Sequence, residues 1–440
     1  MAVVIEYRCT IARWLPKDPD VIQKFQSQLL AQLIKNGVSL RAPVVEQKRR
    51  SPIILKFKKL IEEDAGISRD FQEMFKQVRP NPDPKRRLIT NYMELLAVLD
   101  KTITVAPTYS YTSPLVSGVP MYGVLAPFCN TEAGYRVFTN PKVNAIFHKV
   151  FDKWTKFLVS PASRDVLVST PGGWFSPEAL QVQADRLGMP FAQAWVCYPE
   201  QPHMGFTSWD DFFGRRFREG VRPIFAPDKP EFINAACEAI THRVSTNVKA
   251  TDEFWLKEMP YSLNHILDCD PLTSEFAGGT VFQAMLSSLD YHRWHSPVDG
   301  RVVKTYTIPG TYYAARLDDD PDLDVISRSQ AFVTAISTRA LIFIESDNPN
   351  IGLMCFVGVG LGEISTTKVE VKEGDRVKKG DDIGSFHFGG STYLLLFRPQ
   401  TKLTLLPGPD RPGGARKVGT LLFHVDNDSN LATGGMIRIP

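Results

Sequence analysis

The sequence lacks both a strong bias of charge and a long hydrophobic run. Its 440 residues include 51 Lys and Arg against 48 Asp and Glu, so no excess of positive charge indicates nucleic acid as a partner. The longest uncharged apolar run, residues 351–362, has 12 residues and is rich in glycine. A membrane-spanning helix needs about 20 residues. We therefore expect no stable membrane insertion, and we interpret this run as a buried strand.

Cysteine is also scarce. The six cysteines are scattered, without the spacing of a metal site or a disulfide framework: Cys9, Cys129, Cys197, Cys237, Cys269 and Cys355. The first residues include Glu6, Arg8 and Arg13 and contain no apolar core of a signal peptide. Free thiols and this N-terminal sequence predict a cytoplasmic protein.

Helical periodicity dominates the first part of the chain. Apolar residues recur at helical spacing in residues 18–36, after Ser51-Pro52, and again over residues 143–158. We therefore predict a helical N-terminal domain over residues 1–180. A linker begins near the Gly-rich and Pro-rich residues 169–173.

The pattern changes in the second part of the chain. From Gly279 onward, β-branched and aromatic runs are separated by Gly, Pro and Asp turns, as in residues 341–344, 368–371 and 393–397. This alternation is typical of antiparallel strands. The predicted fold class is α+β, with a β-rich catalytic domain over residues 200–440.

The Gly390-Ser391 bond can be made to cut itself. A serine hydroxyl held against the preceding carbonyl can attack it and convert the peptide bond to an ester, if a base takes the proton and donors hold the oxyanion. Loss of the Cα proton then releases the upstream chain as a carboxylate, and the dehydroalanine at residue 391 hydrolyses to a pyruvoyl group and ammonia. This ketone can form a Schiff base with an amine and accept electrons from a neighbouring bond, the role of pyridoxal phosphate in other enzymes. Neither pyridoxal phosphate nor a lysine is needed.

Two histidines are candidates for the base. His292 and His295 lie in the run Asp-Tyr-His-Arg-Trp-His at residues 290–295. Side chains three residues apart point to opposite faces of a regular strand, so this segment must bend if both histidines serve one site. One of them is then available to take the proton of Ser391.

Four ordered motifs carry a specific resemblance. They are Ser-Trp-Asp-Asp-Phe-Phe-Gly-Arg-Arg-Phe at residues 208–217 followed by Arg222-Pro223-Ile224, Tyr-Ser-Leu at 261–263, the histidine run at 291–295, and Gly-Ser-Thr at 390–392. This order resembles the phosphatidylserine decarboxylases over about residues 205–425. The whole chain is similar to the soluble fungal branch of that family, the psilocybin-pathway type of L-tryptophan decarboxylase.

The resemblance implies a role for each motif residue. Ser391 resembles the precursor of the pyruvoyl group, His295 the histidine that activates it, and His292 the histidine beside the substrate. The family orients its processing histidine with an aspartate in Ala-Asp-Gly, whereas this chain has Glu238 in Ala-Cys-Glu-Ala at residues 236–239. The two chains made by cleavage are expected to stay associated.

The expected substrate is a free aromatic L-amino acid, with L-tryptophan favoured by the whole-chain resemblance. Four aromatic residues flank the proposed catalytic residues in sequence and could line the substrate pocket: Tyr291, Trp294, Phe386 and Phe388. Each of them could instead pack in the core. Phosphatidylserine is the alternative substrate, and it would require a surface that docks on a membrane.

Two further patterns have other interpretations. Residues 373–381 resemble the turn of lipoyl and biotinyl carrier domains, which would make the chain a carrier module, but the nearby Lys368 falls in the adjoining strand rather than at a hairpin tip. Carboxylates alternate over residues 318–324, as in calcium loops, but without the glycine and distal glutamate of an EF-hand. A solvated loop competes with weak calcium binding by Asp318, Asp320, Asp322 and Asp324.

Overall fold

The structure is a computed structural model, and part of the chain is described by it. The described residues are 4–6, 27, 30–31, 50–78, 89–109, 119–252, 260–287, 289–316, 329–364, 366–387, 391–406, 415–426 and 437–438. The helix expected over residues 18–36 lies almost wholly outside them, as does the acidic run 318–324.

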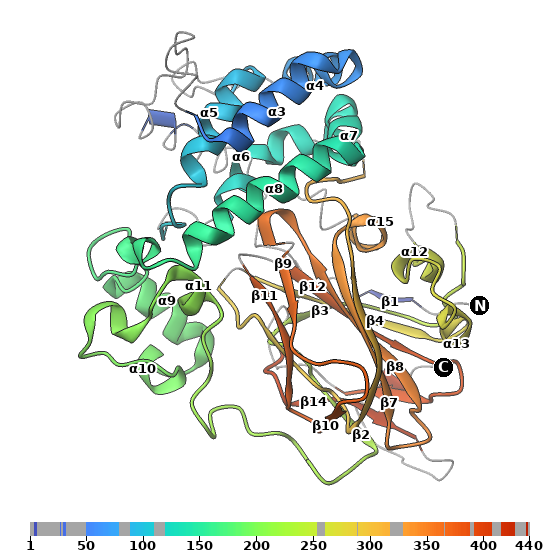
Figure 1. Ribbon diagram of the computed structural model, residues 1–440. Helices are drawn as coiled ribbons and strands as arrows, with labels where there is room; N and C mark the ends of the chain where they lie inside the picture. Colours follow the sequence, from blue (N-terminus) through green and yellow to red (C-terminus); the bar gives the residue numbers. More distant parts are fainter. Residues whose placement is uncertain are drawn as a thin grey trace.

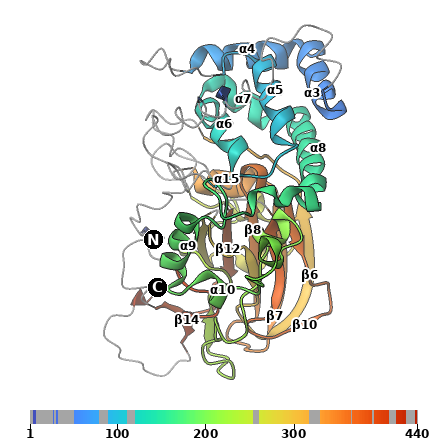
Figure 2. The same cartoon turned by 90° about the vertical axis from the view of Figure 1, so that its left-hand side faces the viewer.

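Helices form one end of the molecule. They are α3 (Pro52–Glu63), α4 (Ala65–Gln77), α5 (Tyr92–Thr102), α6 (Pro120–Cys129), α7 (Glu132–Thr139) and α8 (Pro141–Leu158). Figures 1 and 2 both show them stacked at one end of the β-rich part. In the described part of the chain, no helix combines the length and the apolar character that crossing a membrane requires.

The helices at residues 51–61 and 143–158 form as their sequences predict. Proline at the first position of α3 and of α8 loses no hydrogen bond, because the first N–H groups of a helix have no partner within it. The apolar stripes face inward, so that Phe57, Phe147 and Trp154 are all buried. Phe57 meets Phe147 edge to face at 5.2 Å, which joins the two helices.

Shorter helices connect the layer formed by α3 to α8 with the sheets. They are η2 (Pro161–Val166), α9 (Pro177–Leu187), α10 (Phe191–Ala194), η3 (Pro202–Gly205) and α11 (Trp209–Phe213). Figures 1 and 2 show α9 and α10 beside the β-rich part rather than in the layer of α3 to α8. Helical structure therefore continues past residue 180.

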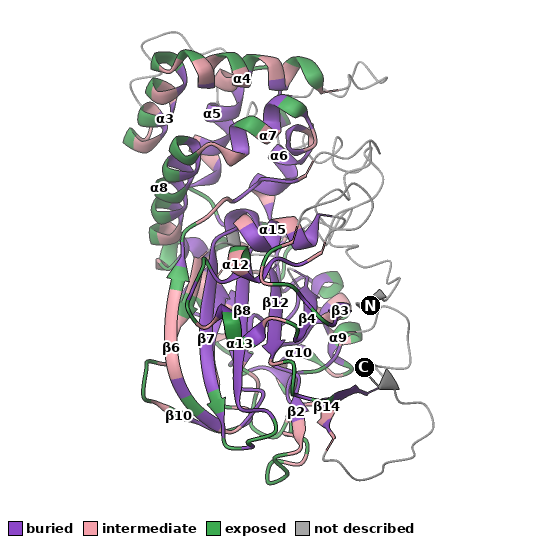
Figure 3. Ribbon diagram, turned by 90° about the vertical axis from the view of Figure 1, so that its right-hand side faces the viewer, coloured by how far each residue is buried: buried purple, intermediate pink, exposed green. Residues whose placement is uncertain are grey.

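Eight antiparallel strands form the main sheet. In spatial order they are β1 (Val4–Glu6), β3 (Ile240–Ser245), β4 (Thr280–Leu286), β12 (Ser391–Phe397), β8 (Leu353–Gly360), β7 (Arg339–Ser346), β6 (Gly300–Ile308) and β10 (Arg376–Val377). The apolar run at residues 351–362 is confirmed as a strand, because it contains β8, which is buried along its whole length. Figure 3 shows β8 and β12 in the buried colour, whereas β6 is partly exposed.

Two smaller sheets and four short helices complete the described part of the fold. One sheet has the order β5 (Arg293–His295), β11 (Asp382–His387) and β9 (Thr366–Val369). The other has the order β15 (Ile437–Arg438), β13 (Leu403–Leu405), β14 (Leu421–Val425) and β2 (Phe232–Asn234). The short helices are α12 (Leu263–Ile266), α13 (Thr273–Phe276), η4 (Gly362–Ile364) and α15 (Gln330–Ile336). The predicted α+β class is confirmed.

Trp294 joins the three-stranded sheet to the main sheet. Its ring meets Phe356 of β8 at 5.1 Å and Phe386 of β11 at 4.7 Å. Two glycines make room for the indole. A Cβ at Gly358 would lie 2.8 Å from the indole, and a Cβ at Gly384 would lie 2.5 Å from it and 2.6 Å from the carbonyl oxygen of Lys368.

This packing predicts the effect of one methyl group. We expect Gly384→Ala to lower the free energy of unfolding by about 1–3 kcal/mol, because neither the indole nor the backbone of Lys368 can move away freely. Gly66→Ala is the control, since a Cβ there would be in ordinary contact 3.4 Å from Asp64. Urea unfolding of both variants measures the difference, and equal stability would show that the interface between the sheets is loosely packed.

Candidate active site

Ser391 begins a central strand of the main sheet. Its Cα partners are Leu286, the last residue of β4, and Gly360, the last residue of β8. The side chain is 1% exposed, and its hydroxyl has no hydrogen-bond partner among the described residues. Gly390 and Phe388 lie outside those residues. The predicted reactive position is therefore a buried serine at the point where three neighbouring strands begin or end.

His295 is held as a neutral imidazole. Its Nδ1 lies 2.7 Å from the carbonyl oxygen of Gly380, which can only accept, so Nδ1 carries the proton. Nε2 then accepts a hydrogen bond of 2.8 Å from the hydroxyl of Tyr291. Burial lowers the pKa of His295, although the Gly380 carbonyl opposes the shift. This tautomer leaves the lone pair of Nε2 as the basic atom.

His292 points to other partners. It is fully buried just before β5, and its ring stacks on Phe213 of α11 with centroids 4.2 Å apart. Its backbone carbonyl accepts a hydrogen bond of 2.8 Å from the amide of Phe386. The two histidines thus leave the segment in different directions, and the resemblance alone assigns both to one site.

Glu238 is paired with Arg222 of the Arg-Pro-Ile motif. The two side chains form a buried ion pair, and the Arg222 guanidinium also lies 4.3 Å above the ring of Phe217. Burial raises the pKa of Glu238, while the hydrogen bond from Arg222 opposes this rise. Among the described residues, no hydrogen bond joins Glu238 to His295, whose partners are Gly380 and Tyr291.

The aromatic candidates for the substrate pocket separate into two groups. Tyr291 lies beside His295, and Phe217 packs on it with ring centroids 4.5 Å apart. Trp294 and Phe386 are fully buried between the three-stranded sheet and the main sheet, so both pack in the core. Burial and nearby charges, Asp382 among them, raise the pKa of the Tyr291 hydroxyl, so it remains a proton donor to His295.

Two cavities flank this region. One of about 230 Å³ is lined by Tyr291, His295, Arg222 and Gly380, with others from residues 216–224. The other, of about 430 Å³, is lined by polar side chains that include Arg293, Glu370 and His387. In the wall of this larger cavity, Arg293 forms ion pairs with Asp382 at 2.6 Å and with Glu370 at 2.8 Å. The smaller cavity therefore gives access to the proposed base.

The structure also pairs a histidine with a carboxylate that the sequence does not assign to a site. His387 Nδ1 lies 2.7 Å from Asp210 Oδ1 at the edge of the larger cavity. Asp210 belongs to the motif at residues 208–217, and His387 lies four residues before Ser391. Their closeness to these motifs is the signal that the sequence offers for the two residues. The contact between them, across 177 positions, is visible only in the fold.

A buried polar network also escaped the sequence interpretation. The hydroxyl of Thr392 donates to the carbonyl of Ala284 at 2.9 Å and accepts a hydrogen bond of 2.9 Å from Gln283. Gln283 in turn accepts a hydrogen bond from Tyr261 of the Tyr-Ser-Leu motif. Thr392 follows Ser391 in the strand and so faces the opposite side of the sheet. The network fixes the strand that carries Ser391.

Comparison with known proteins identifies the family. Two family models, both described as phosphatidylserine decarboxylase, match residues 51–183 and 209–419. An L-tryptophan decarboxylase of Psilocybe cubensis is 34% identical over 93% of each chain, and one of Psilocybe cyanescens is 36% identical over 94% of each chain. The decarboxylase iboD of Amanita muscaria is 42% identical over 66% of this chain and 87% of its own length.

The chain belongs to the phosphatidylserine decarboxylase family. Within the family it falls in the branch of the fungal L-tryptophan decarboxylases, and it is a carboxy-lyase. This membership favours an enzyme over the carrier module suggested by residues 373–381. A phosphatidylserine decarboxylase proenzyme of Schizosaccharomyces pombe is similar over 46% of this chain only, at 32% identity.

Residue 391 fits the family's pyruvoyl group. Its hydroxyl is buried and has no partner in the described part of the chain, so it is not committed to a structural hydrogen bond. Metal binding is different. Asp318, Asp320, Asp322 and Asp324 lie outside the described residues, and within those residues no cluster of His, Cys, Asp and Glu could hold a metal ion. Calcium binding stays a prediction.

The pairing of Arg222 with Glu238 predicts a large effect on stability. We expect Arg222→Met to cost about 3–5 kcal/mol of unfolding free energy, because it leaves the carboxylate of Glu238 buried without its cation. Adding Glu238→Gln should recover more than half of the loss. The control is Arg376→Met, whose exposed pair with Asp347 should contribute at most about 1 kcal/mol.

Urea unfolding of the wild type, Arg222→Met, Glu238→Gln and the double variant gives the coupling free energy between the two side chains. If Glu238→Gln alone left stability unchanged but stopped self-cleavage, the glutamate would be acting with His295 rather than with Arg222.

Proposed function

We propose that this chain is a pyruvoyl-dependent decarboxylase of a free aromatic L-amino acid, converting L-tryptophan to tryptamine and CO2. One observation carries the choice of substrate. The relatives named L-tryptophan decarboxylase match 93–94% of the chain, whereas relatives named phosphatidylserine decarboxylase proenzyme match 44–49% of it. The similarity to the amino-acid enzymes thus extends through the helical part.

Self-cleavage between Gly390 and Ser391 comes first in this proposal. Ser391 attacks the carbonyl of Gly390, and His295 takes the hydroxyl proton. The neutral state of His295, with its proton on Nδ1 and its lone pair on Nε2, supports this assignment. Tyr291 donates to Nε2, so it either moves aside or relays the proton.

The two chains produced by cleavage would stay associated. Strand β12 belongs to the downstream chain and is paired along its whole length with β4 and β8 of the upstream chain. Strand β14, also downstream, pairs with β2 upstream. Separating the chains would expose these strand edges and the buried core between them.

In the mature enzyme the pyruvoyl group at residue 391 supplies an electrophilic ketone that accepts the electron pair of the bond to CO2. His292 is the candidate that returns a proton to the substrate carbon. Its full burial and its stacking on Phe213 would hold the ring in one orientation and keep water from competing as the donor. The scattered cysteines keep the cytoplasm as the proposed location.

Intact mass under denaturing conditions tests the cleavage. We expect the wild type to give a chain of 390 residues and one of 50 residues, the latter with the mass of a pyruvoyl group at its blocked N-terminus. Ser391→Ala should stay full-length and inactive, because it has no nucleophile. Cleavage of Ser391→Ala would move the site elsewhere in the chain.

Product analysis tests the substrate. The cleaved wild type should release tryptamine from L-tryptophan and no phosphatidylethanolamine from phosphatidylserine vesicles. The reverse result would assign the lipid as substrate. A cleaved protein that acts on neither would leave self-processing established and reject both substrates.

Substitutions of the two histidines should affect different stages, self-cleavage for His295 and turnover for His292. His295→Ala is expected to remain uncut, because the serine loses its base. His292→Ala should cut itself normally but turn over at least about 100-fold more slowly, the usual contribution of a general acid. Mass spectrometry followed by the tryptamine assay distinguishes them, and the opposite pattern would exchange their roles.

A further inference from the structure

A buried glutamate links the helical layer to the sheet that carries Ser391. Glu363, in the turn η4 after β8, is fully buried. Its carboxylate accepts hydrogen bonds from the amides of Met121, at 2.9 Å, and Tyr122, at 3.1 Å. These amides begin helix α6, where the first N–H groups have no partner within the helix. Glu363 therefore caps a helix more than 200 positions earlier in the chain.

The local sequence cannot provide this cap. The residue before α6 is Val119, whose side chain makes no capping hydrogen bond, and Pro120 follows it. A carboxylate is the strongest acceptor for such amides, and it also interacts favourably with the positive end of the helix dipole. The position of α6 on the sheet thus depends on Glu363.

Tyr313 strengthens the same connection. Its hydroxyl donates to the carboxylate of Glu363 at 3.1 Å. Its ring packs against Phe147 at 5.3 Å and Phe138 at 5.9 Å, both of the helical layer. Gly362 fits beside this ring at φ +61°, and a Cβ there would lie 3.3 Å from the ring of Tyr313. The turn is therefore fixed on both sides.

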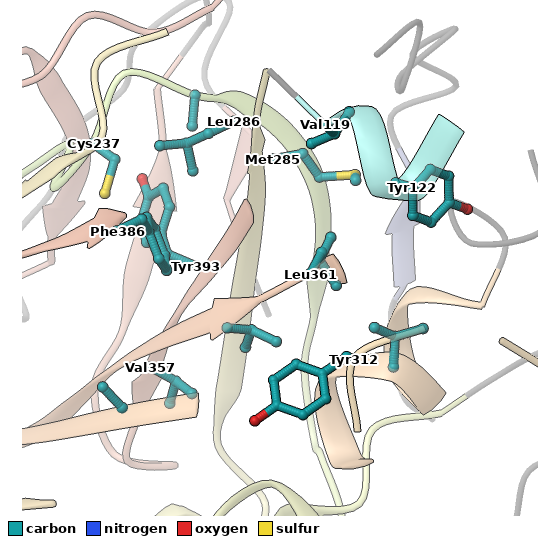
Figure 4. Packing of buried hydrophobic residues seen from close by; sticks show 14 of the residues in the cluster. Val119, Tyr122, Cys237, Met285, Leu286, Tyr312, Val357, Leu361, Phe386 and Tyr393 are labelled. Atoms are coloured by element: carbon teal, nitrogen blue, oxygen red, sulfur yellow. The ribbon is translucent and has the colours of Figure 1, made fainter. Parts of the chain in front are cut away.

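This turn lies close to residue 391. Gly360 is the Cα partner of Ser391, and Glu363 follows only three residues later, so roughly 10 Å of chain separates the helix cap from the reactive strand. Strands β4 and β8 end opposite the start of β12, so the turn with Glu363 and residue 391 lie at the same end of the main sheet. Figure 4 shows Val119 and Tyr122 of this region beside Met285 and Leu361.

The charge state of Glu363 is sensitive near neutral pH. Burial raises its pKa to about 7, although the hydrogen bonds from Tyr122, Tyr313 and Met121 oppose the rise. Because this pKa is above the value in the unfolded chain, the associated stabilisation is present at low pH and is lost as the pH rises through about 7. Glu363→Gln should remove this dependence.

We infer that Glu363 is a positioning residue that sets substrate selectivity, by fixing the start of α6 as an apolar wall near residue 391. The inference rests on the proposed function, because it assumes a free amino acid bound there. A rigid apolar wall would favour a flat side chain such as indole over a small one. The amino-acid decarboxylases that match this chain along almost its whole length share its helical part.

The test compares kcat and KM for L-tryptophan and L-alanine. We expect Glu363→Ala to cleave itself fully and to keep its kcat for L-tryptophan. Its KM should rise about tenfold, and its preference for L-tryptophan over L-alanine should fall about tenfold, because the amides that begin α6 lose the carboxylate that holds them. Glu363→Gln can still accept from the amides and should stay within about threefold of the wild type.

A control separates positioning from general damage. Glu94→Ala removes another buried carboxylate of the helical layer, one that accepts from Thr90 at 3.0 Å, and it should leave selectivity unchanged. Hydrogen exchange at the amides of Met121 and Tyr122 should speed up in Glu363→Ala only. If Glu363→Ala does not fold, Tyr313→Phe replaces it, because it removes a single donor and should still lower the preference for L-tryptophan.

Unchanged selectivity in a folded and cleaved Glu363→Ala, or in Tyr313→Phe, would overturn the inference. Failure of the proposed function gives a different result, since the wild type itself would then form no tryptamine. In that case faster exchange at Met121 and Tyr122 would still show the cap, and the absence of any selectivity for L-tryptophan would reject its role in substrate choice.

Discussion

The pairing of β12 between β4 and β8 is the constraint on which the rest of the structure depends. Ser391 is the first residue of that strand, and both neighbouring strands end opposite it. A serine in the middle of such a sheet would be locked by hydrogen bonds on both sides, and one in an open loop would have no fixed position. At the beginning of a buried central strand, one side of the residue is held by the sheet and the other can change its covalent connection.

Buried charge is handled around this strand by pairing. Arg222 is paired with Glu238 and Arg186 with Asp290, while Arg293 is shared by Asp382 and Glu370. Each pair compensates for the loss of hydration that a lone buried charge would suffer. His295 is treated differently, because its acceptor is the neutral carbonyl of Gly380 and its environment disfavours the imidazolium. The result is a neutral imidazole within a region that contains many charges.

The helical layer and the sheets meet through polar as well as apolar contacts. Glu363 accepts hydrogen bonds from the start of α6 and from Tyr313, whose ring packs into the aromatic cluster of the helices. Since a buried carboxylate is stable only with its donors in place, this contact specifies one arrangement of the two layers more strictly than apolar packing alone. The start of α6 is thereby held close to the reactive end of β12.

The sequence by itself determined the local features of this protein. Proline and apolar spacing gave α3 and α8, the uncharged run gave the buried strand β8, and the ordered motifs gave the family and the position of Ser391. These follow from short-range rules of backbone geometry and periodicity. Only the tertiary structure decided which groups meet: Glu238 with Arg222, His387 with Asp210, Trp294 between two glycines, and Glu363 at a distant helix. Strand pairing and core packing bring together residues that are far apart in the chain, and no local sequence pattern specifies which of them meet.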